Sequence, residues 1–117
     1  MAESKIIRGT SENLVKTTLG SSSYVTYCRA GNVVTLDVLY SVSELGTISA
    51  WGSKTIATLP VGYRPKINVS VLMETDRASS AGSQLSVGQN GNVTVASRFN
   101  SISESSDILR GCLSFVV

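Results

Sequence analysis

The side chains best suited to catalysis in this sequence are two pairs of closely spaced carboxylates, Glu74 with Asp76 and Glu104 with Asp107. Glycoside hydrolysis uses two carboxyl groups held roughly 5–10 Å apart across a sugar. The chain contains no histidine, and neither a GxSxG nor an SxxK motif, so the common nucleophile templates are excluded. We interpret the four carboxylates as solvated loop residues and predict that the protein is not an enzyme. A carboxylate-dependent glycan depolymerase is the alternative.

Six side chains are better suited to binding a ligand than to transforming one. Asp and Asn accept hydrogen bonds from paired hydroxyls, Arg donates in a fixed fork, and an indole can stack on a sugar ring. The candidates for glycan contacts are Trp51, Asp76, Arg77, Arg98, Asn100 and Glu104. All except Trp51 lie in two polar loops, 74–83 and 97–107. The mixture suits a neutral or anionic glycan; ordinary solvated loops and a tryptophan packed at the edge of the core are the alternative.

The two cysteines, Cys28 and Cys112, are far apart in the sequence and belong to no CxxC motif. With no histidine to complete a ligand set, the sequence predicts neither a metal site nor a cofactor. Two free, half-buried thiols are expected for a chain made in a reducing cytoplasm, and a long-range disulfide is the alternative.

The composition of the chain limits the kinds of partner that the protein can bind. The 117 residues are enough for one domain with one core. Charged residues make up 15% of the chain, and the basic ones are scattered, whereas nucleic-acid binding needs a concentrated basic patch. The first residues lack the apolar segment of a signal peptide, and no run of about 18 apolar residues occurs. We therefore expect no nucleic-acid partner, no membrane insertion and no export by a signal peptide.

The elements that must position these candidates are strands. Alternating apolar residues predict a hairpin over 24–40, a strand over 67–73, a second hairpin over 85–95 around Asn90-Gly91, and a closing strand over 109–117. Between the first hairpin and the 67–73 strand lie a looser segment, 41–54, and a stiff corner formed by Pro60, Gly62 and Pro65.

Several short strands with no convincing helix predict an all-β fold, an antiparallel β-sandwich or jelly-roll-like domain. We expect residues 1–20 to be an N-terminal lead-in and attachment segment, and residues 21–117 to be the sandwich. Some strands also carry apolar residues on the face away from the predicted core, namely Val25, Tyr27, Val33, Leu39, Leu72 and Val116. Because the chain has so few charges, we expect this second face to be covered in an oligomer.

These features resemble the C-terminal head domain of receptor-binding proteins and tail fibres of tailed phages and prophages. Four segments carry the resemblance, with the corner as the specific one: the hairpin YCRAGNVV at 27–34, the corner IATLPVGYRP at 56–65, the hairpin VGQNGNVTV at 87–95, and the closing strand LSFVV at 113–117. The resemblance covers about residues 24–117.

The resemblance implies a compact head domain that forms a homotrimer at the tip of a fibre or baseplate in the virion. It also implies recognition of bacterial cell-surface saccharide and attachment to upstream fibre or baseplate parts. It transfers no binding residue, since the tip loops have no motif that can be matched position by position. A purely structural trimerising module is the alternative to a receptor-binding one.

Overall fold

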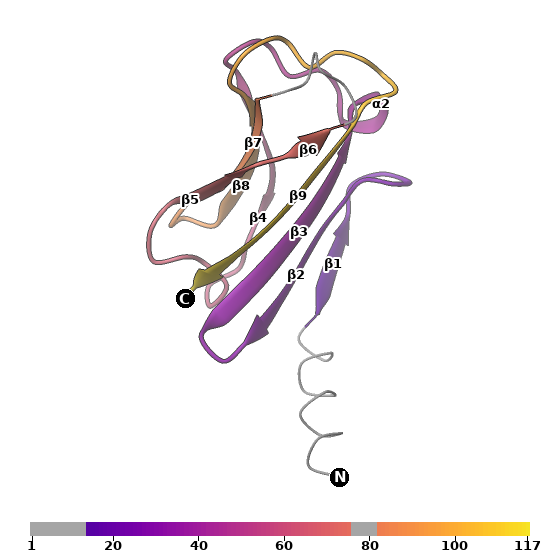
Figure 1. Cartoon of the computed structure of the whole chain (residues 1–117). Helices are drawn as coiled ribbons and strands as arrows, with labels where there is room; N and C mark the ends of the chain where they lie inside the picture. Colours follow the sequence, from indigo (N-terminus) through magenta and orange to yellow (C-terminus); the bar gives the residue numbers. More distant parts are fainter. Residues whose placement is uncertain (1–13, 76–81) are drawn as a thin grey trace.

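A computed structural model describes residues 14–75 and 82–117 of the chain. The predicted β-sandwich is confirmed: two antiparallel sheets pack against each other (Figure 1). The elements are β1 (Val15–Thr18), β2 (Tyr24–Ala30), β3 (Val33–Ser41), α2 (Val42–Leu45), β4 (Ser53–Thr58), β5 (Val69–Leu72), β6 (Glu74–Thr75), β7 (Ser83–Val87), β8 (Asn92–Ser97) and β9 (Ile108–Val116).

The first sheet has the strand order β1-β2-β3-β9-β6, and the second has the order β4-β8-β7-β5. The chain passes from the second sheet to the first at Met73, which lies between β5 and β6. Figure 1 shows β9 running beside β3 for the length of that strand, and Val33 is paired with Val116 at one end of their register. The long β3–β9 pairing joins residues far apart in the sequence and holds the first sheet together.

The core lies between the sheets and is built from the inward positions of the alternating strands. Val34, Leu36, Val38 and Tyr40 of β3 are fully buried, as the alternation predicts. They face Leu85, Val87, Val93 and Val95 of the second sheet within one apolar cluster. Burial of this kind supplies most of the free energy that stabilises such a fold, at about 25 cal/mol per Å² of apolar surface.

One expectation about the first hairpin is wrong, and a strand lies within the predicted lead-in. Val25 and Tyr27 belong to the core and not to the second face, because β2 is paired with β3 in a register that places Val25 beside the buried Val38. Val15–Thr18 is extended, but as β1 it is hydrogen-bonded to β2. The sandwich therefore begins at Val15, before the predicted boundary at residue 20; residues 1–13 lie outside the described part of the chain.

The proline corner joins β4 and β5, which are the two edge strands of the second sheet. Gly62 has a φ of 98°, a conformation that favours glycine, and its carbonyl accepts a hydrogen bond from Arg29 Nη1 at 2.7 Å. Tyr63 packs edge to face against Tyr27, with ring centroids 5.1 Å apart. The corner is a structural device, as predicted, and it ties the second sheet to the first.

The looser segment 41–54 contains the one-turn helix α2, a loop and the first residues of the edge strand β4. Glu44 of α2 fastens this segment to the turn between β1 and β2. Its carboxylate accepts hydrogen bonds from Ser21 Oγ and Ser23 Oγ, both at 2.6 Å, and from the backbone N–H groups of Ser22 and Ser23. A Cβ on Gly20 would lie 2.8 Å from that carboxylate, so glycine leaves room for it.

The hydrogen bonds to the Glu44 carboxylate predict that the folded protein loses stability in acid. The hydrogen bond from Ser21, followed by those from Ser23 and Ser22, lowers the pKa of Glu44 from 4.5 to about 2. A carboxyl whose pKa is depressed on folding stabilises the fold above its unfolded pKa, and this stabilisation is lost as the pH falls from about 4.5 to about 2. Urea unfolding over that range should show a smaller loss of stability for Glu44→Gln than for the wild type. Glu104→Gln, at an exposed position, is the control; an identical pH profile for all three proteins would contradict the assignment.

Candidate binding groove

A groove of about 360 Å³ crosses the outer face of the second sheet. Its lining comes from β4, β7 and β8 and from the turns beside them: Trp51, Ser53, Asn68, Ser86, Val87, Gly88, Asn90, Asn92, Thr94, Ala96 and Arg98. Most of these side chains are small, polar and uncharged. The volume lies at the lower end of the range of small-molecule sites, about 300–1,000 Å³.

Strand alternation explains the polar floor of the groove. Val93 and Val95 of β8 point into the core, so Asn92 and Thr94 point outward. Ser86 of β7 is the cross-strand partner of Thr94, and Thr55 of β4 is its partner on the other side. The hydroxyls of Thr55 and Thr94 are 3.3 Å apart. Three adjacent strands therefore present a row of hydroxyl groups, each able to donate and accept hydrogen bonds.

Trp51 lies at one end of the groove, and its side chain is 68% exposed. Its φ of 61° makes it the single non-glycine residue with a left-handed backbone in the described ranges. This conformation costs an L-residue about 1–2 kcal/mol, and an exposed indole buries little apolar surface in return. Neither property stabilises the isolated domain, so the ring is placed where a ligand could stack on it.

Arg98 lies at the same end of the groove, directly after β8. Its Nε donates to Gln84 Oε1 at 2.6 Å, which orients the guanidinium and leaves its two Nη groups without a partner among the described residues. No carboxylate takes part in the lining formed by the described residues. The single formal charge of this lining is therefore positive.

Asparagine side chains form the other end of the groove. Asn68 Oδ1 accepts a hydrogen bond from the backbone N–H of Gln89 at 3.0 Å, and Asn90 Oδ1 accepts one from the backbone N–H of Asn92 at 3.1 Å. Asn92 Oδ1 accepts from the hydroxyl of Thr58 at 3.1 Å. The three amides are thus held by their oxygens: Asn68 and Asn90 by the N–H groups of Gln89 and Asn92, and Asn92 by the hydroxyl of Thr58 on β4.

The structure brings two of the six predicted contact residues into the groove, Trp51 and Arg98. Asn100 and Glu104 are exposed in the 97–107 loop and do not line it, and the backbone carbonyl of Asn100 accepts a hydrogen bond from Ser97 Oγ. Asp76 and Arg77 lie outside the described residues.

Sequence reasoning missed the groove residues on the strands and their turns, namely Ser53, Asn68, Ser86, Asn90, Asn92 and Thr94. The available signal was a run of uncharged polar residues at every second position of the 85–95 hairpin. Such a run also describes an ordinary solvated sheet face, so the pattern by itself does not select these residues.

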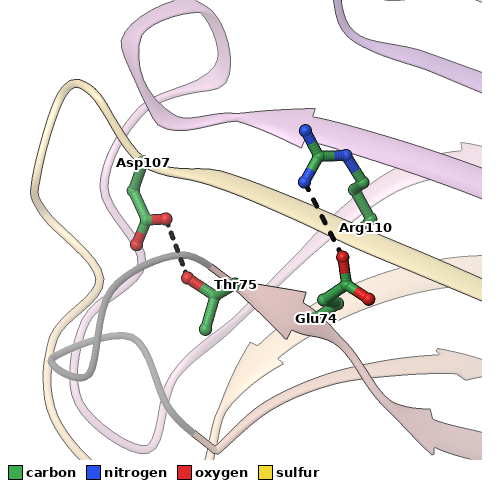
Figure 2. Close-up of polar contacts among 4 residues, drawn as sticks. All are labelled: Glu74, Thr75, Asp107 and Arg110. Carbon is green, nitrogen blue, oxygen red and sulfur yellow. Dashed lines mark hydrogen bonds and ion pairs between the residues drawn. The ribbon is translucent and has the colours of Figure 1, made fainter.

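Three of the four predicted carboxylates, Glu74, Glu104 and Asp107, lie in the described part of the chain, and two of them contact other side chains. Figure 2 shows Glu74 beside Arg110, with Glu74 Oε1 3.9 Å from Arg110 Nη1, and Asp107 accepting a hydrogen bond from the Thr75 hydroxyl at 2.8 Å. Asp107 is buried, whereas Glu104 is exposed. Asp76, the predicted partner of Glu74, lies outside the described residues.

Cys28 and Cys112 are both free thiols, so the disulfide alternative is wrong. Cys28 is half-buried as predicted, whereas Cys112 is exposed because its side chain lies on the outer face of β9. Cys28 is paired with Thr35 and Cys112 with Asp37, which places β3 between the two cysteines. A search of the described residues finds no group of three or more His, Cys, Asp or Glu side chains arranged to hold a metal ion. Nor does that part of the chain contain a helix with the length and apolar character needed to cross a membrane.

The fold and groove define a class of protein, a small antiparallel β-sandwich with a polar groove on one sheet. No protein-family model matches the chain, and no curated protein matches it. Among solved structures, the chain is similar to the head domain of phage bIL170, which was described in connection with the receptor-binding domains of lactococcal phages. The TM-score is 0.60 at 14% sequence identity, over 89% of this chain and 98% of that one. The resemblance to phage head domains is thus confirmed in the fold, along most of both chains.

Proposed function

We propose that this protein is the receptor-binding head domain of a phage tail and that it binds saccharide on the surface of the host bacterium. The observation that carries the proposal is the uncharged polar groove beside the exposed Trp51, on a fold shared with the head domain of phage bIL170. In this proposal the domain resides at the tail tip of the virion.

The groove's chemistry matches a sugar in three respects. The Ser, Thr and Asn side chains supply hydrogen bonds to hydroxyls, the indole supplies a flat apolar surface for a ring face, and the open shape admits a polymer. Binding rather than hydrolysis is proposed because the described lining offers no carboxylate, whereas glycosidases use two.

The same proposal includes a homotrimer whose N-terminal segment attaches to upstream fibre or baseplate parts. Val33 and Val116 support it: they are cross-strand partners on the outer face of the first sheet and are 43% and 54% exposed. Leu72 on the edge strand β5 is 72% exposed. Three shallow sites on one particle would gain avidity from simultaneous binding. Light scattering that showed a monomer at micromolar concentration would remove the trimer from the proposal.

The test is binding of the fluorescently labelled protein to a panel of intact Gram-positive and gut bacteria. The expected result is saturable binding to a subset of strains, competition by the purified wall polysaccharide of a bound strain, and no release of reducing ends from it. Binding to none of the strains, in a protein that still forms trimers, would favour the purely structural module. Release of reducing ends would favour a depolymerase.

A further inference from the structure

The asparagines of the groove are oriented as hydrogen-bond donors. A backbone N–H can only donate, so the side-chain atoms of Asn68 and Asn90 that face the N–H groups of Gln89 and Asn92 must be carbonyl oxygens. Each NH₂ group is then left without a partner among the described residues. A Cβ on Gly88 would lie 2.8 Å from Asn90 Oδ1, so the glycine leaves space for this orientation.

Other donors in the groove add to these two. Asn92 is engaged through its oxygen by Thr58, and the Nη groups of Arg98 have no partner among the described residues, so four side chains present N–H donors. The described lining has no carboxylate, and each of the three amide oxygens already accepts one hydrogen bond within the fold, whereas the NH₂ groups have no partner among the described residues. A plain hydroxyl both donates and accepts, whereas a carbonyl oxygen only accepts. The groove is therefore better matched to ligand carbonyl oxygens than to hydroxyls alone.

The donors are also spread along the groove. Asn92 and Arg98 stand six positions apart, and at about 3.3 Å per residue of strand this is roughly 20 Å. A single sugar ring cannot reach both ends over that length. Because Trp51 and Arg98 lie at one end and Asn68 and Asn90 at the other, a ligand that uses all of them must be a chain.

We propose that the groove binds an internal segment of an N-acetylated saccharide chain, lying along β8 over several rings, with acetamido carbonyl oxygens accepting from the asparagine amides and one ring stacked on Trp51. This inference rests on the proposed function and names the substrate class of the same groove. Acetamido groups fit better than a carboxylate on every ring, because most of the donors are neutral and one cation stands at one end.

Isothermal titration with matched oligosaccharide series tests the proposal. N-acetylglucosamine oligomers and glucose oligomers with the same β-1,4 linkage, each from one to six rings, differ in the acetamido group. We expect the acetylated tetramer to bind about tenfold or more tightly than the glucose tetramer, since each added hydrogen bond contributes about 1 kcal/mol. We also expect the affinity to rise with chain length over the first few rings. Equal affinity in the two series, or no gain beyond one ring, would overturn the proposal.

Two variants test the donors without removing the oxygens that the fold uses. Asn68→Asp and Asn90→Asp keep an acceptor for the backbone N–H and replace the NH₂ group by an oxygen. Each substitution should lower the affinity for the acetylated tetramer about fivefold to tenfold. Asn32→Asp, on the β2–β3 turn outside the groove, is the control for the added charge. Thermal unfolding of each variant separates a folding defect from a binding defect. If all three variants bind as the wild type does, the donor assignment is wrong.

The outcomes separate this inference from the proposed function. Binding to host cells together with indifference to acetylation would overturn the inference alone. Tighter binding of galacturonic acid oligomers than of acetylated ones would replace the acetamido assignment with an acidic one. Absence of binding to every strain and every oligosaccharide would overturn both.

Discussion

Replacing Gly91 by alanine is expected to destabilise the protein by about 3–5 kcal/mol. Gly91 has a φ of 89°, and an added Cβ would lie 2.6 Å from the carbonyl oxygen of Leu59 and 2.7 Å from Arg64 Nε. The first of these is a backbone atom that cannot rotate away, and the Gly91 carbonyl also accepts a hydrogen bond from the Leu59 N–H at 2.8 Å. Backbone strain and overpacking each cost about 1–3 kcal/mol, and urea unfolding measures their sum.

Gly31→Ala is the matched control. Gly31 also has a positive φ, 63°, but a Cβ added there would meet nothing within 4 Å. This substitution carries the backbone strain without the clash, so its expected cost is about 1 kcal/mol. A loss of stability at Gly91 no larger than that at Gly31 would show that the contact between the β7–β8 turn and the proline corner does not hold the fold together.

Replacing Trp51 by glycine is expected to separate binding from stability. The indole is 68% exposed on a left-handed backbone with a φ of 61°, a conformation that glycine adopts without strain. The free energy of unfolding should therefore stay the same or rise by up to about 1 kcal/mol. Loss of the contact between the indole and a sugar ring should weaken binding to host cells by about tenfold or more, because truncating a central aromatic contact residue typically costs about 2 kcal/mol of binding free energy.

Phe99→Gly is the control for an exposed aromatic ring. Phe99 is 61% exposed in the 97–107 loop and does not line the groove. Its removal should leave cell binding unchanged. If Trp51→Gly binds cells as the wild type does, or if Phe99→Gly loses binding equally, the groove is not the receptor site.

Local signals account for the parts of the fold that were predicted correctly. Asn90-Gly91 between two alternating runs predicts the β7–β8 hairpin, and the alternation in 33–41 and 109–117 predicts which residues of β3 and β9 are buried. These signals act between neighbours in the sequence, because strand pleating sets the side of each residue and turn residues set the register.

The prediction for β2 was wrong because an alternating sequence does not by itself show which face of a strand is buried. In β2, either Tyr24, Thr26 and Cys28 or Val25, Tyr27 and Arg29 can face the core on the basis of composition. The structure selects the second set, through pairing of Val25 with the buried Val38. A shift of one residue in the pairing register would exchange the buried and exposed faces of β2. Only the pairing with β3 therefore decides which face lies in the core.

The candidate groove likewise combines features that the sequence predicted with features that only tertiary packing set. Composition and pattern indicated a β-sandwich with few charges, a stiff proline corner and an exposed aromatic candidate, because each depends on a residue's own chemistry and its near neighbours. The strand order β4-β8-β7-β5 was not readable from the chain, since it is set by packing between segments far apart in the sequence. That order places Thr55, Thr94 and Ser86 side by side, and the β7–β8 turn places Asn68 near Asn90. The sequence by itself determined which side chains can hydrogen-bond or stack, and the tertiary structure decided which of them share one groove.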